Sequence, residues 1–202
     1  MKTIGLTGQS GAGKGAFSKA LSLLGIPCLD TDVTARQVVE KGKPCLLELV
    51  DRFGKDILLP DGTLDRKKLG TIAFSDKEKL SALNSITHRY IALEVDEWLE
   101  EQKDNGAFAA VIDAPQLFES GIDSICDLTV AILADENTRF RRILSRDSIS
   151  EEYAKKRMAS QKDDEFFISH CDHIIYNNGD EAELFEKAKT FVYDHLTNEE
   201  HK

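Results

Sequence analysis

The sequence predicts an α/β protein of three layers (α/β/α), in which helices cover both faces of a five-stranded parallel sheet. Short apolar runs alternate with longer helical patterns, an arrangement typical of parallel strands joined by helices. The 202 residues show no internal repeat, low-complexity run or linker, and 41% are hydrophobic, which is sufficient for a packed core. We therefore expect a single domain over residues 1–202.

Five apolar runs are expected to form the strands of the sheet. Asp30 ends the second run, and Asp113 with Pro115 ends the third, which agrees with the preference of these residues for turns. The runs are Ile4 to Thr7, Cys28 to Leu29, Ala109 to Ile112, Leu128 to Leu133, and Ile174 to Ile175.

Helical patterns fill the intervals between the expected strands. Apolar residues between Lys14 and Leu24 recur at the spacing of one helix face. Ser75, with Glu78 three residues later, matches a capping box and predicts that a long helix opens there. The expected helical stretches are Lys14 to Leu24, Asp32 to Phe53 with a break near Gly42 and Pro44, Ser75 to Trp98, Thr138 to Gln161, and Glu181 to His195.

The charge and the apolar pattern restrict the class of partner. A formal net charge of -10 argues against a general nucleic-acid binder, although a few local Lys and Arg residues could still hold an anionic substrate. No apolar stretch is long enough to span a membrane, and the first residues read as a strand rather than a signal peptide. We expect a cytoplasmic protein, and the sequence implies no protein partner.

The strongest motif is GQSGAGK at residues 8–14, which fits the pattern G-x-x-x-x-G-K. Glycines let the backbone turn its N–H groups toward phosphate oxygens, and a following helix adds its unpaired N–H groups and the positive end of its dipole. A glycine-rich turn with an incidental lysine is the alternative. The strand before the motif and the helix after it favour a P-loop that binds a nucleotide.

The motif departs from the usual pattern at one position. A Ser or Thr normally follows the lysine and supplies a hydroxyl ligand to Mg²⁺. Here Gly15 and Ala16 follow Lys14, so neither position carries a hydroxyl. Because Mg²⁺ readily keeps several water ligands, a water could replace the missing hydroxyl.

Seven segments in chain order resemble motifs of the dephospho-CoA kinase family. Residues 30–39, DTDVTARQVV, resemble D-A-D-x-x-A-R-x-V-V, and residues 113–119, DAPQLFE, resemble D-x-P-L-L-F-E. The others are the glycine-rich motif, FGKDIL with DGTLDR in residues 53–66, LNSITH at 83–88, RMASQ at 157–161 and DHIIYNNG at 172–179. Arg89 and Gln116 replace a proline and an apolar residue of the family pattern.

The resemblance implies both a fold and a reaction. The fold would be a P-loop NTPase core over residues 1–57, 106–137 and 170–202, with a helical substrate-binding insert over about 58–105 and a helical lid over about 138–169. The reaction would use ATP and Mg²⁺ to phosphorylate the ribose 3′-hydroxyl of dephospho-CoA, giving CoA and ADP.

Three residues are the candidate catalytic groups. Lys14 would reach the β- and γ-phosphates as a point charge. Asp32, just past the end of the second strand, is the candidate general base and could also hold Mg²⁺ through water; an ordinary helix N-cap is its alternative role. Arg142 matches an ATP-contacting arginine of the family and would clamp the γ-phosphate, unless it belongs to a solvated charged face together with Arg139 and Arg141.

The remaining candidates are binding residues, and each has an ordinary structural alternative. The charged ones could instead form surface salt bridges, a lone histidine is more often structural, and Asn178 with Gly179 could form a simple turn rather than meet adenine. The nucleotide-binding candidates are Gly8, Gly11, Ala12, Gly13, Lys14, Gly15, Ala16, Arg146, Asn178 and Gly179, and the substrate-binding candidates are Asp30, Arg36, Arg66, His88 and Asp113.

Two other functions remain open from the residues alone. Another small-molecule kinase would share the glycine-rich loop and the lid, but the segments at 30–39 and 61–66 argue against it. A nucleotide-binding protein that has lost catalysis would explain Gly15, Arg89 and Gln116.

Overall fold

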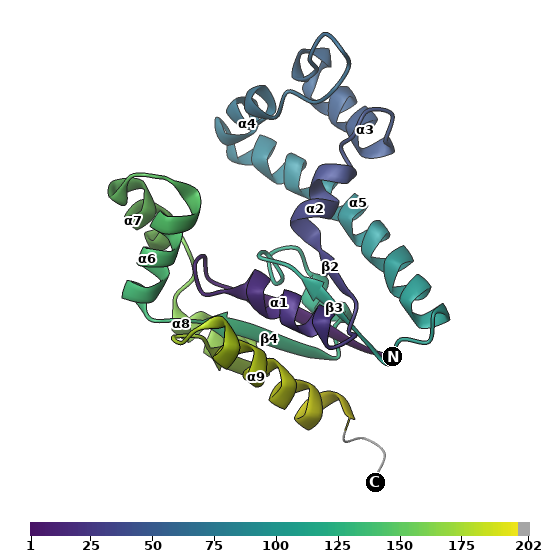
Figure 1. The fold of residues 1–202 in the computed structure, drawn as a ribbon. Coiled ribbons are helices and arrows are strands. Elements are labelled where there is room, and N and C mark those ends of the chain that lie inside the picture. The colour runs from purple at the N-terminus through teal and green to yellow at the C-terminus, as the bar shows by residue number, and fades with distance from the viewer. Residues whose placement is uncertain (198–202) are drawn as a thin grey trace. The chain divides into compact units, whose positions relative to one another are not determined.

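The structure is a computed structural model that describes residues 1–197 (Figure 1). Two compact units divide the chain. One, the core unit, comprises Met1–Leu29 and the chain from Leu99 onward, and the other, the helical unit, comprises Asp30–Trp98. Each unit is described by itself below.

The core unit is built on a five-stranded sheet, as the sequence predicts. Strand order is β2-β3-β1-β4-β5, and β1 runs parallel to both β3 and β4, while β5 runs parallel to β4. The strands are β1 (Lys2–Gly8), β2 (Cys28–Asp30), β3 (Ala109–Asp113), β4 (Leu128–Leu133) and β5 (His173–Tyr176). The carboxyl ends of the parallel strands therefore meet at one edge, where open α/β sheets usually bind ligands.

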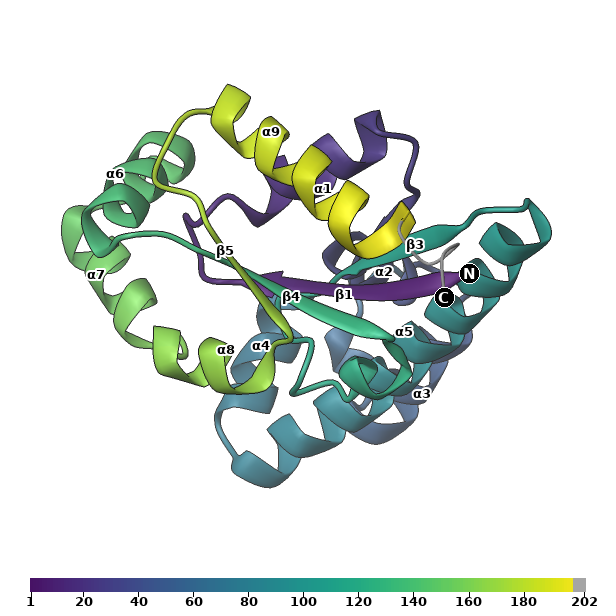
Figure 2. The ribbon, with the colours of Figure 1, turned by 90° about the horizontal axis from the view of Figure 1, so that it is seen from below.

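Helices cover both faces of this sheet (Figure 2). On one face lie α1 (Lys14–Leu23) and α9 (Glu181–Val192), whose Phe17 and Phe191 rings meet edge to face at 6.0 Å among buried strand residues such as Ile4 and Ile132. On the other face α8 (Asp164–His170) buries Phe167 against Leu133. The predicted α/β/α layering is confirmed.

The chain between β4 and β5 does not form the single helix expected over Thr138 to Gln161. It forms α6 (Glu136–Asp147), then α7 (Glu151–Ala159) and then α8. Ser148 has a left-handed backbone, with φ of 50°, and a residue in that conformation cannot continue a right-handed helix. The sequence around Ser148 is rich in charged residues and contains no glycine or proline, so it does not predict this break.

The helical unit contains no strand of the sheet beyond Asp30 within the described residues. Its elements are α2 (Thr31–Gln37), α3 (Pro44–Phe53), a 3₁₀ turn η1 (Lys55–Ile57), α4 (Arg66–Phe74) and α5 (Lys77–Asp104), the last of which continues past Trp98 into the core unit. The expected break near Gly42 and Pro44 separates α2 from α3. Pro44 is the first residue of α3, where its missing N–H costs nothing.

The capping box expected at Ser75 is wrong. Ser75 ends α4, and its hydroxyl donates to the carbonyl of Ile72 at 2.8 Å. The cap of α5 is Asp76, whose carboxylate accepts the backbone N–H of Glu78 at 2.7 Å. Aspartate is as good an N-cap as serine, so the sequence offers two adjacent candidates, and the structure uses Asp76 rather than Ser75.

Two short turns complete the described chain: η2 (Ile122–Ile125), which precedes β4, and η3 (Tyr193–Thr197), which follows α9. Within residues 1–197, none of the helices combines the length and the apolar character needed to span a bilayer.

Candidate functional site

The glycine-rich motif forms a loop between β1 and α1, at the carboxyl edge of the sheet. Gly13 is the N-cap of α1 and has φ of 100°, a conformation that L side chains rarely adopt. A Cβ at this position would collide with the amide of Asn177, which donates to the carbonyl of Ala12 at 2.8 Å. Glycine is therefore required here by conformation and by space.

The loop's backbone N–H groups divide into two sets. The N–H of Ala12 donates to the carbonyl of Gln9 at 3.1 Å, and the N–H of Ser10 donates to the side-chain oxygen of Gln161, also at 3.1 Å. Among the described residues, the N–H groups of Gly11 and Gly13 have no acceptor. Together with the amino-terminal end of the α1 dipole, they form a cradle of donors that suits an anion.

Lys14 follows this loop as the first residue of α1 and pairs with the carboxylate of Asp113. Asp113 is the last residue of β3, and its neighbour across the sheet is Leu6 of β1, so the two strands bring lysine and aspartate together. The exposed fraction is 17% for the lysine side chain and 5% for the aspartate. The structure thus joins two of the predicted site residues in a largely buried ion pair.

Arg142, on α6, ties the glycine-rich loop to the segment after β5. Its guanidinium donates to the carbonyl of Asn177 at 2.8 Å, to that of Gly179 at 2.8 Å and to that of Ala12 at 3.4 Å. Arg142 is therefore not part of a solvated face. The side chain of Asn178 accepts the backbone N–H of Asp135 at 2.8 Å, so this loop is also fixed to the start of α6.

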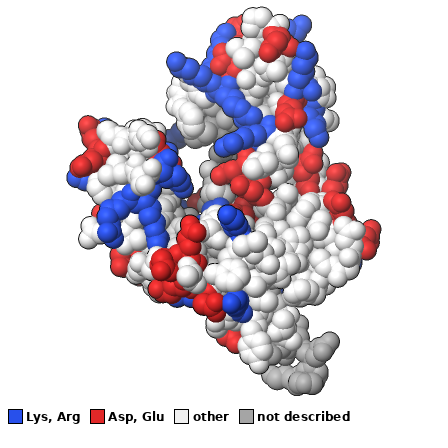
Figure 3. All heavy atoms as spheres, in the orientation of Figure 1, with Lys and Arg blue, Asp and Glu red and all other residues white. Residues whose placement is uncertain are grey.

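Arg146, one turn further along α6, is placed differently. It is exposed and makes two hydrogen bonds to its neighbour Asp147, which also pairs with Arg157 of α7. Hydrogen bonds from Arg146 lower the pKa of the Asp147 carboxyl to about 2. In this conformation Arg146 braces the turn between the two helices rather than the glycine-rich loop. Lys and Arg side chains gather over α6 and α7 in Figure 3.

Sequence reasoning missed three side chains that hold the glycine-rich loop. Arg139, expected on a solvated face, is only 7% exposed, and its Nε donates to the carbonyl of Ser10 at 3.1 Å. Burial lowers the pKa of this guanidinium. Gln161 accepts from both Ser10 and Arg139, and Gln9 donates to Asp164 at 2.9 Å. The i, i+3 spacing of Arg139 and Arg142 was the available signal.

In the helical unit, the start of α2 separates the roles of two aspartates. The side chain of Asp30 is the N-cap, accepting the backbone N–H groups of Asp32 at 2.8 Å and of Val33 at 3.3 Å. The capping role considered for Asp32 is therefore filled by Asp30. The Asp32 carboxylate is exposed and has no hydrogen-bond partner within residues 1–197.

Three further substrate candidates, Arg36, Arg66 and His88, belong to the helical unit, whereas Asp113 is buried in the core unit. Arg66, the first residue of α4, donates to the backbone carbonyl of Arg36 at 3.2 Å, so these two arginines are neighbours. His88 is half-buried on α5. The adjacent Arg89 pairs with Glu48 of α3, which also accepts from Tyr90 at 2.9 Å.

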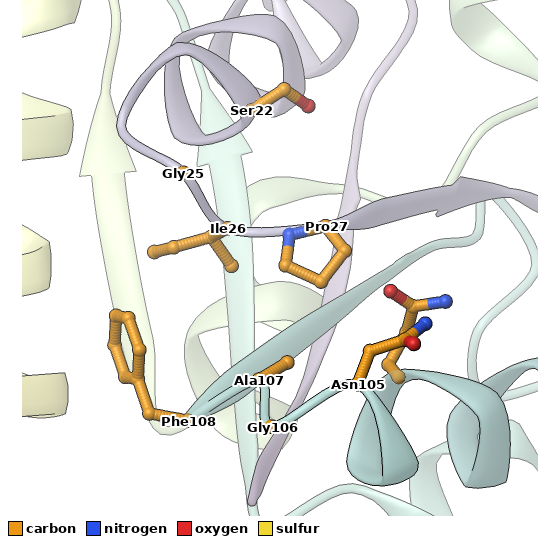
Figure 4. A pocket seen from close by; sticks show the side chains of 9 residues that line it. Ser22, Gly25, Ile26, Pro27, Asn105, Gly106, Ala107 and Phe108 are labelled. Carbon is orange, nitrogen blue, oxygen red and sulfur yellow. The ribbon is translucent and has the colours of Figure 1, made fainter.

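A pocket of about 500 Å³ lies at the other edge of the sheet in the core unit (Figure 4). It is lined by the residues that precede β2 and β3, including Pro27 and Phe108, and by the end of α5. This is the amino-terminal edge of the strands, opposite to the glycine-rich loop, so the pocket is not the anion cradle.

A parallel sheet whose first strand leads through this glycine-rich loop into a helix defines a P-loop nucleotide-binding protein. The family model for dephospho-CoA kinase matches residues 2–183. The chain is 41% identical over 197 residues to a dephospho-CoA kinase of Corynebacterium efficiens, with 98% of each chain covered, and 39% identical over 200 residues to one of Listeria innocua, again with 98% of each covered. The chain belongs to the dephospho-CoA kinase family.

Solved structures agree with this assignment. A protein from Thermus thermophilus matches with a TM-score of 0.83 at 28% identity, and the dephospho-CoA kinase from Campylobacter jejuni with a TM-score of 0.72 at 27% identity; each comparison covers 97% of this chain and 98% of the other. A shikimate kinase from Bacteroides thetaiotaomicron, at 16% identity and a TM-score of 0.51, covers 95% of this chain and 96% of its own and shares the fold.

Proposed function

We propose that this ATP-dependent kinase phosphorylates the ribose 3′-hydroxyl of dephospho-CoA. The observation that carries the proposal is the cradle of backbone N–H groups in the loop that leads to Lys14, in a chain that matches the family over nearly its whole length. Such a cradle binds the phosphates of ATP. Membership of the family indicates that dephospho-CoA is the acceptor of the phosphoryl group. A cytoplasmic location and action without a protein or nucleic-acid partner stay predictions of the sequence.

Each candidate residue has a proposed role in the transfer. Asp32 accepts the proton of the ribose hydroxyl, whose oxygen forms the new bond to the γ-phosphorus as the bond from that phosphorus to ADP breaks. Lys14 places positive charge beside the β- and γ-phosphates as negative charge shifts toward ADP. Arg142 and the loop at Asn178 and Gly179 bind the nucleotide. Arg146 can contact the nucleotide only if it gives up its hydrogen bonds to Asp147.

Substrate recognition is assigned to the helical unit. Arg36 and Arg66 are exposed cations, and their guanidinium groups match phosphate geometry, so they are the proposed ligands of the dephospho-CoA phosphates. His88 and Asp30 are the proposed polar contacts, although Asp30 also caps α2. The limits predicted for the insert, about 58–105, and for the lid, about 138–169, remain part of this proposal.

The residues present fit Mg²⁺, which normally takes one or two protein carboxylates and keeps several waters. Gly15 is exposed and has open space where a side chain would stand, which leaves room for a water in place of the usual hydroxyl. Asp32 would hold the ion through water, and the bound ion would neutralise charge on the phosphates. Asp113, which pairs with Lys14, is a second carboxylate, at the end of β3.

The proposal is tested by measuring ADP release from ATP and Mg²⁺ with dephospho-CoA as acceptor, and with adenosine and AMP as controls. Turnover with dephospho-CoA alone, with phosphorus NMR placing the new phosphate on the ribose, is the expected result. Turnover with a control acceptor instead would reject dephospho-CoA as the substrate. ATP binding without turnover on any acceptor would mean that the chain has lost catalysis.

A further inference from the structure

Arg139 is a buried cation to which neither the motif nor the proposed reaction gives a role. Only 7% of Arg139 is exposed, although the residues beside it in the sequence, Thr138 and Phe140, do not predict that it is buried. No ion pair joins it to a carboxylate within residues 1–197; its guanidinium instead donates to two neutral oxygens, the Ser10 carbonyl at 3.1 Å and the Gln161 amide at 2.9 Å. Burial outweighs the attraction of the nearby Asp164 and Glu136 carboxylates and lowers the pKa of this guanidinium, so the charge is buried at a cost that calls for a reason.

The geometry of the peptide bond supplies that reason. In a planar trans peptide the C=O and the N–H of one unit point in opposite directions. The unit that carries the Ser10 carbonyl also carries the N–H of Gly11. Because Arg139 holds that carbonyl toward α6, the N–H of Gly11 points away from α6.

The same rule applies one peptide further along the loop. The carbonyl of Ala12 is held by the amide of Asn177 at 2.8 Å and by Arg142 at 3.4 Å, and its peptide unit carries the N–H of Gly13. Thus the two N–H groups without an acceptor in the described chain belong to the two peptide units whose carbonyls are held from outside. The intervening N–H of Ala12 is taken by the carbonyl of Gln9, and the N–H of Ser10, just before Gly11, is taken by the side chain of Gln161.

We propose that Arg139 is a positioning residue, which turns the N–H of Gly11 toward the phosphates of the nucleotide by holding the Ser10 carbonyl outward. A hydrogen bond from a cation to a carbonyl also polarises the peptide unit, so the N–H of Gly11 becomes a stronger donor. This inference rests on the proposed binding of ATP in the loop, but not on the identity of the acceptor.

The packing of α6 allows this role to be tested. A Cβ on Gly11 would lie 2.6 Å from the backbone carbonyl of Arg139, so the helix and the loop are in backbone contact. Ile143, on the same face of α6, is fully buried. Because these contacts do not involve the guanidinium, the Arg139→Met variant is expected to keep α6 in place and to lose only the hydrogen bonds.

Arg141 is a matched control. It lies on the same helix and is exposed, and its guanidinium bonds within α6 to the carbonyl of Asn137 at 3.3 Å and to the hydroxyl of Thr138 at 3.4 Å. Arg141→Met therefore removes the same charge from the same helix without changing a contact of the glycine-rich loop.

The experiment compares ATP binding by calorimetry for the native chain, Arg139→Met and Arg141→Met. We expect the ATP dissociation constant to rise roughly ten- to hundred-fold in Arg139→Met, as for the loss of a hydrogen bond to a charged group, and to change less than about two-fold in Arg141→Met. The KM for dephospho-CoA should stay unchanged in both, and the amide NMR signal of Gly11 should shift only in Arg139→Met.

Arg139→Lys is the conservative variant. It keeps the charge but replaces the planar fork with a single ammonium, so we expect ATP affinity between those of the native chain and Arg139→Met. Native ATP affinity in a folded Arg139→Met or Arg139→Lys variant would overturn the proposal, as would equal losses in Arg139→Met and Arg141→Met. Calorimetry needs no turnover, so a failure to phosphorylate dephospho-CoA would leave this result readable.

Discussion

The charged candidates around the glycine-rich loop are fixed by the fold, apart from the exposed Arg146, whereas most candidates of the helical unit have exposed side chains. Lys14 and Asp113 form a largely buried pair, and Arg142 donates to three backbone carbonyls. In the helical unit Asp32 and Arg66 are exposed, and within residues 1–197 the Arg66 guanidinium donates only to the backbone carbonyl of Arg36.

This difference follows from what each unit is proposed to bind. A phosphate held by backbone N–H groups requires peptides that are already oriented, because a loop that reorganises on binding loses affinity. Long charged side chains can reach a substrate from a stable helix without being held beforehand. The comparison predicts that substitutions of buried or hydrogen-bonded side chains such as Lys14 change stability together with activity, whereas substitutions of exposed side chains without a partner in the described chain, such as Asp32, change activity alone.

The largest effect is expected for Lys14→Met. Loss of the charge beside the phosphates should lower kcat/KM about a thousand-fold. Because the carboxylate of Asp113 stays buried after its partner is removed, the free energy of unfolding should also fall by about 3 kcal/mol. Steady-state kinetics and urea unfolding measure the two effects, with Lys19→Met, an exposed lysine on the same helix, as the control.

A double variant separates the two effects. Lys14→Met with Asp113→Asn removes the buried charge, so stability should return toward that of the native chain while activity stays low. Unchanged stability in Lys14→Met alone would contradict the view that the fold holds this residue.

The second prediction compares Asp32 with Asp30, two residues apart in the helical unit. Asp32→Asn should lower kcat about a hundred-fold, as for loss of a general base, and leave stability unchanged because the carboxylate is exposed and has no partner in the described chain. Asp30→Ala should cost about 1 kcal/mol of unfolding free energy, because it removes the cap of α2. Equal activity losses in the two variants would remove the reason for choosing Asp32 as the base.

The fold was largely predictable because the core unit follows strong periodic signals. The strand expected at Leu128 to Leu133 is found with the same limits, and the helix after the glycine-rich loop begins at Lys14 as expected. The breaks were less visible. Ser148 carries no glycine or proline signal, and Ser75 competes with an adjacent aspartate for the same capping role.

The site was only partly predictable, for a related reason. The glycine spacing identifies the anion cradle, and strand ends place Asp113 beside it. The partners that hold the loop, Arg139 and Gln161, lie more than a hundred residues from it in the sequence. The i, i+3 spacing of Arg139 and Arg142 indicates that they share a helix face, but not that this face meets the loop. Such partners are set by tertiary packing, which short motifs do not report.

The smallest effect is expected at Gly15, where the core unit leaves open space. Gly15→Ser restores the hydroxyl that usually follows the lysine, so the Mg²⁺ concentration for half-maximal rate should fall a few-fold, as for one added oxygen ligand. Gly15→Ala is the matched control: both variants should gain a few tenths of a kcal/mol of helix stability, and only serine adds a ligand. If the two variants show the same Mg²⁺ dependence, the ion is held without this position, and the ligands are the carboxylates and the substrate phosphates.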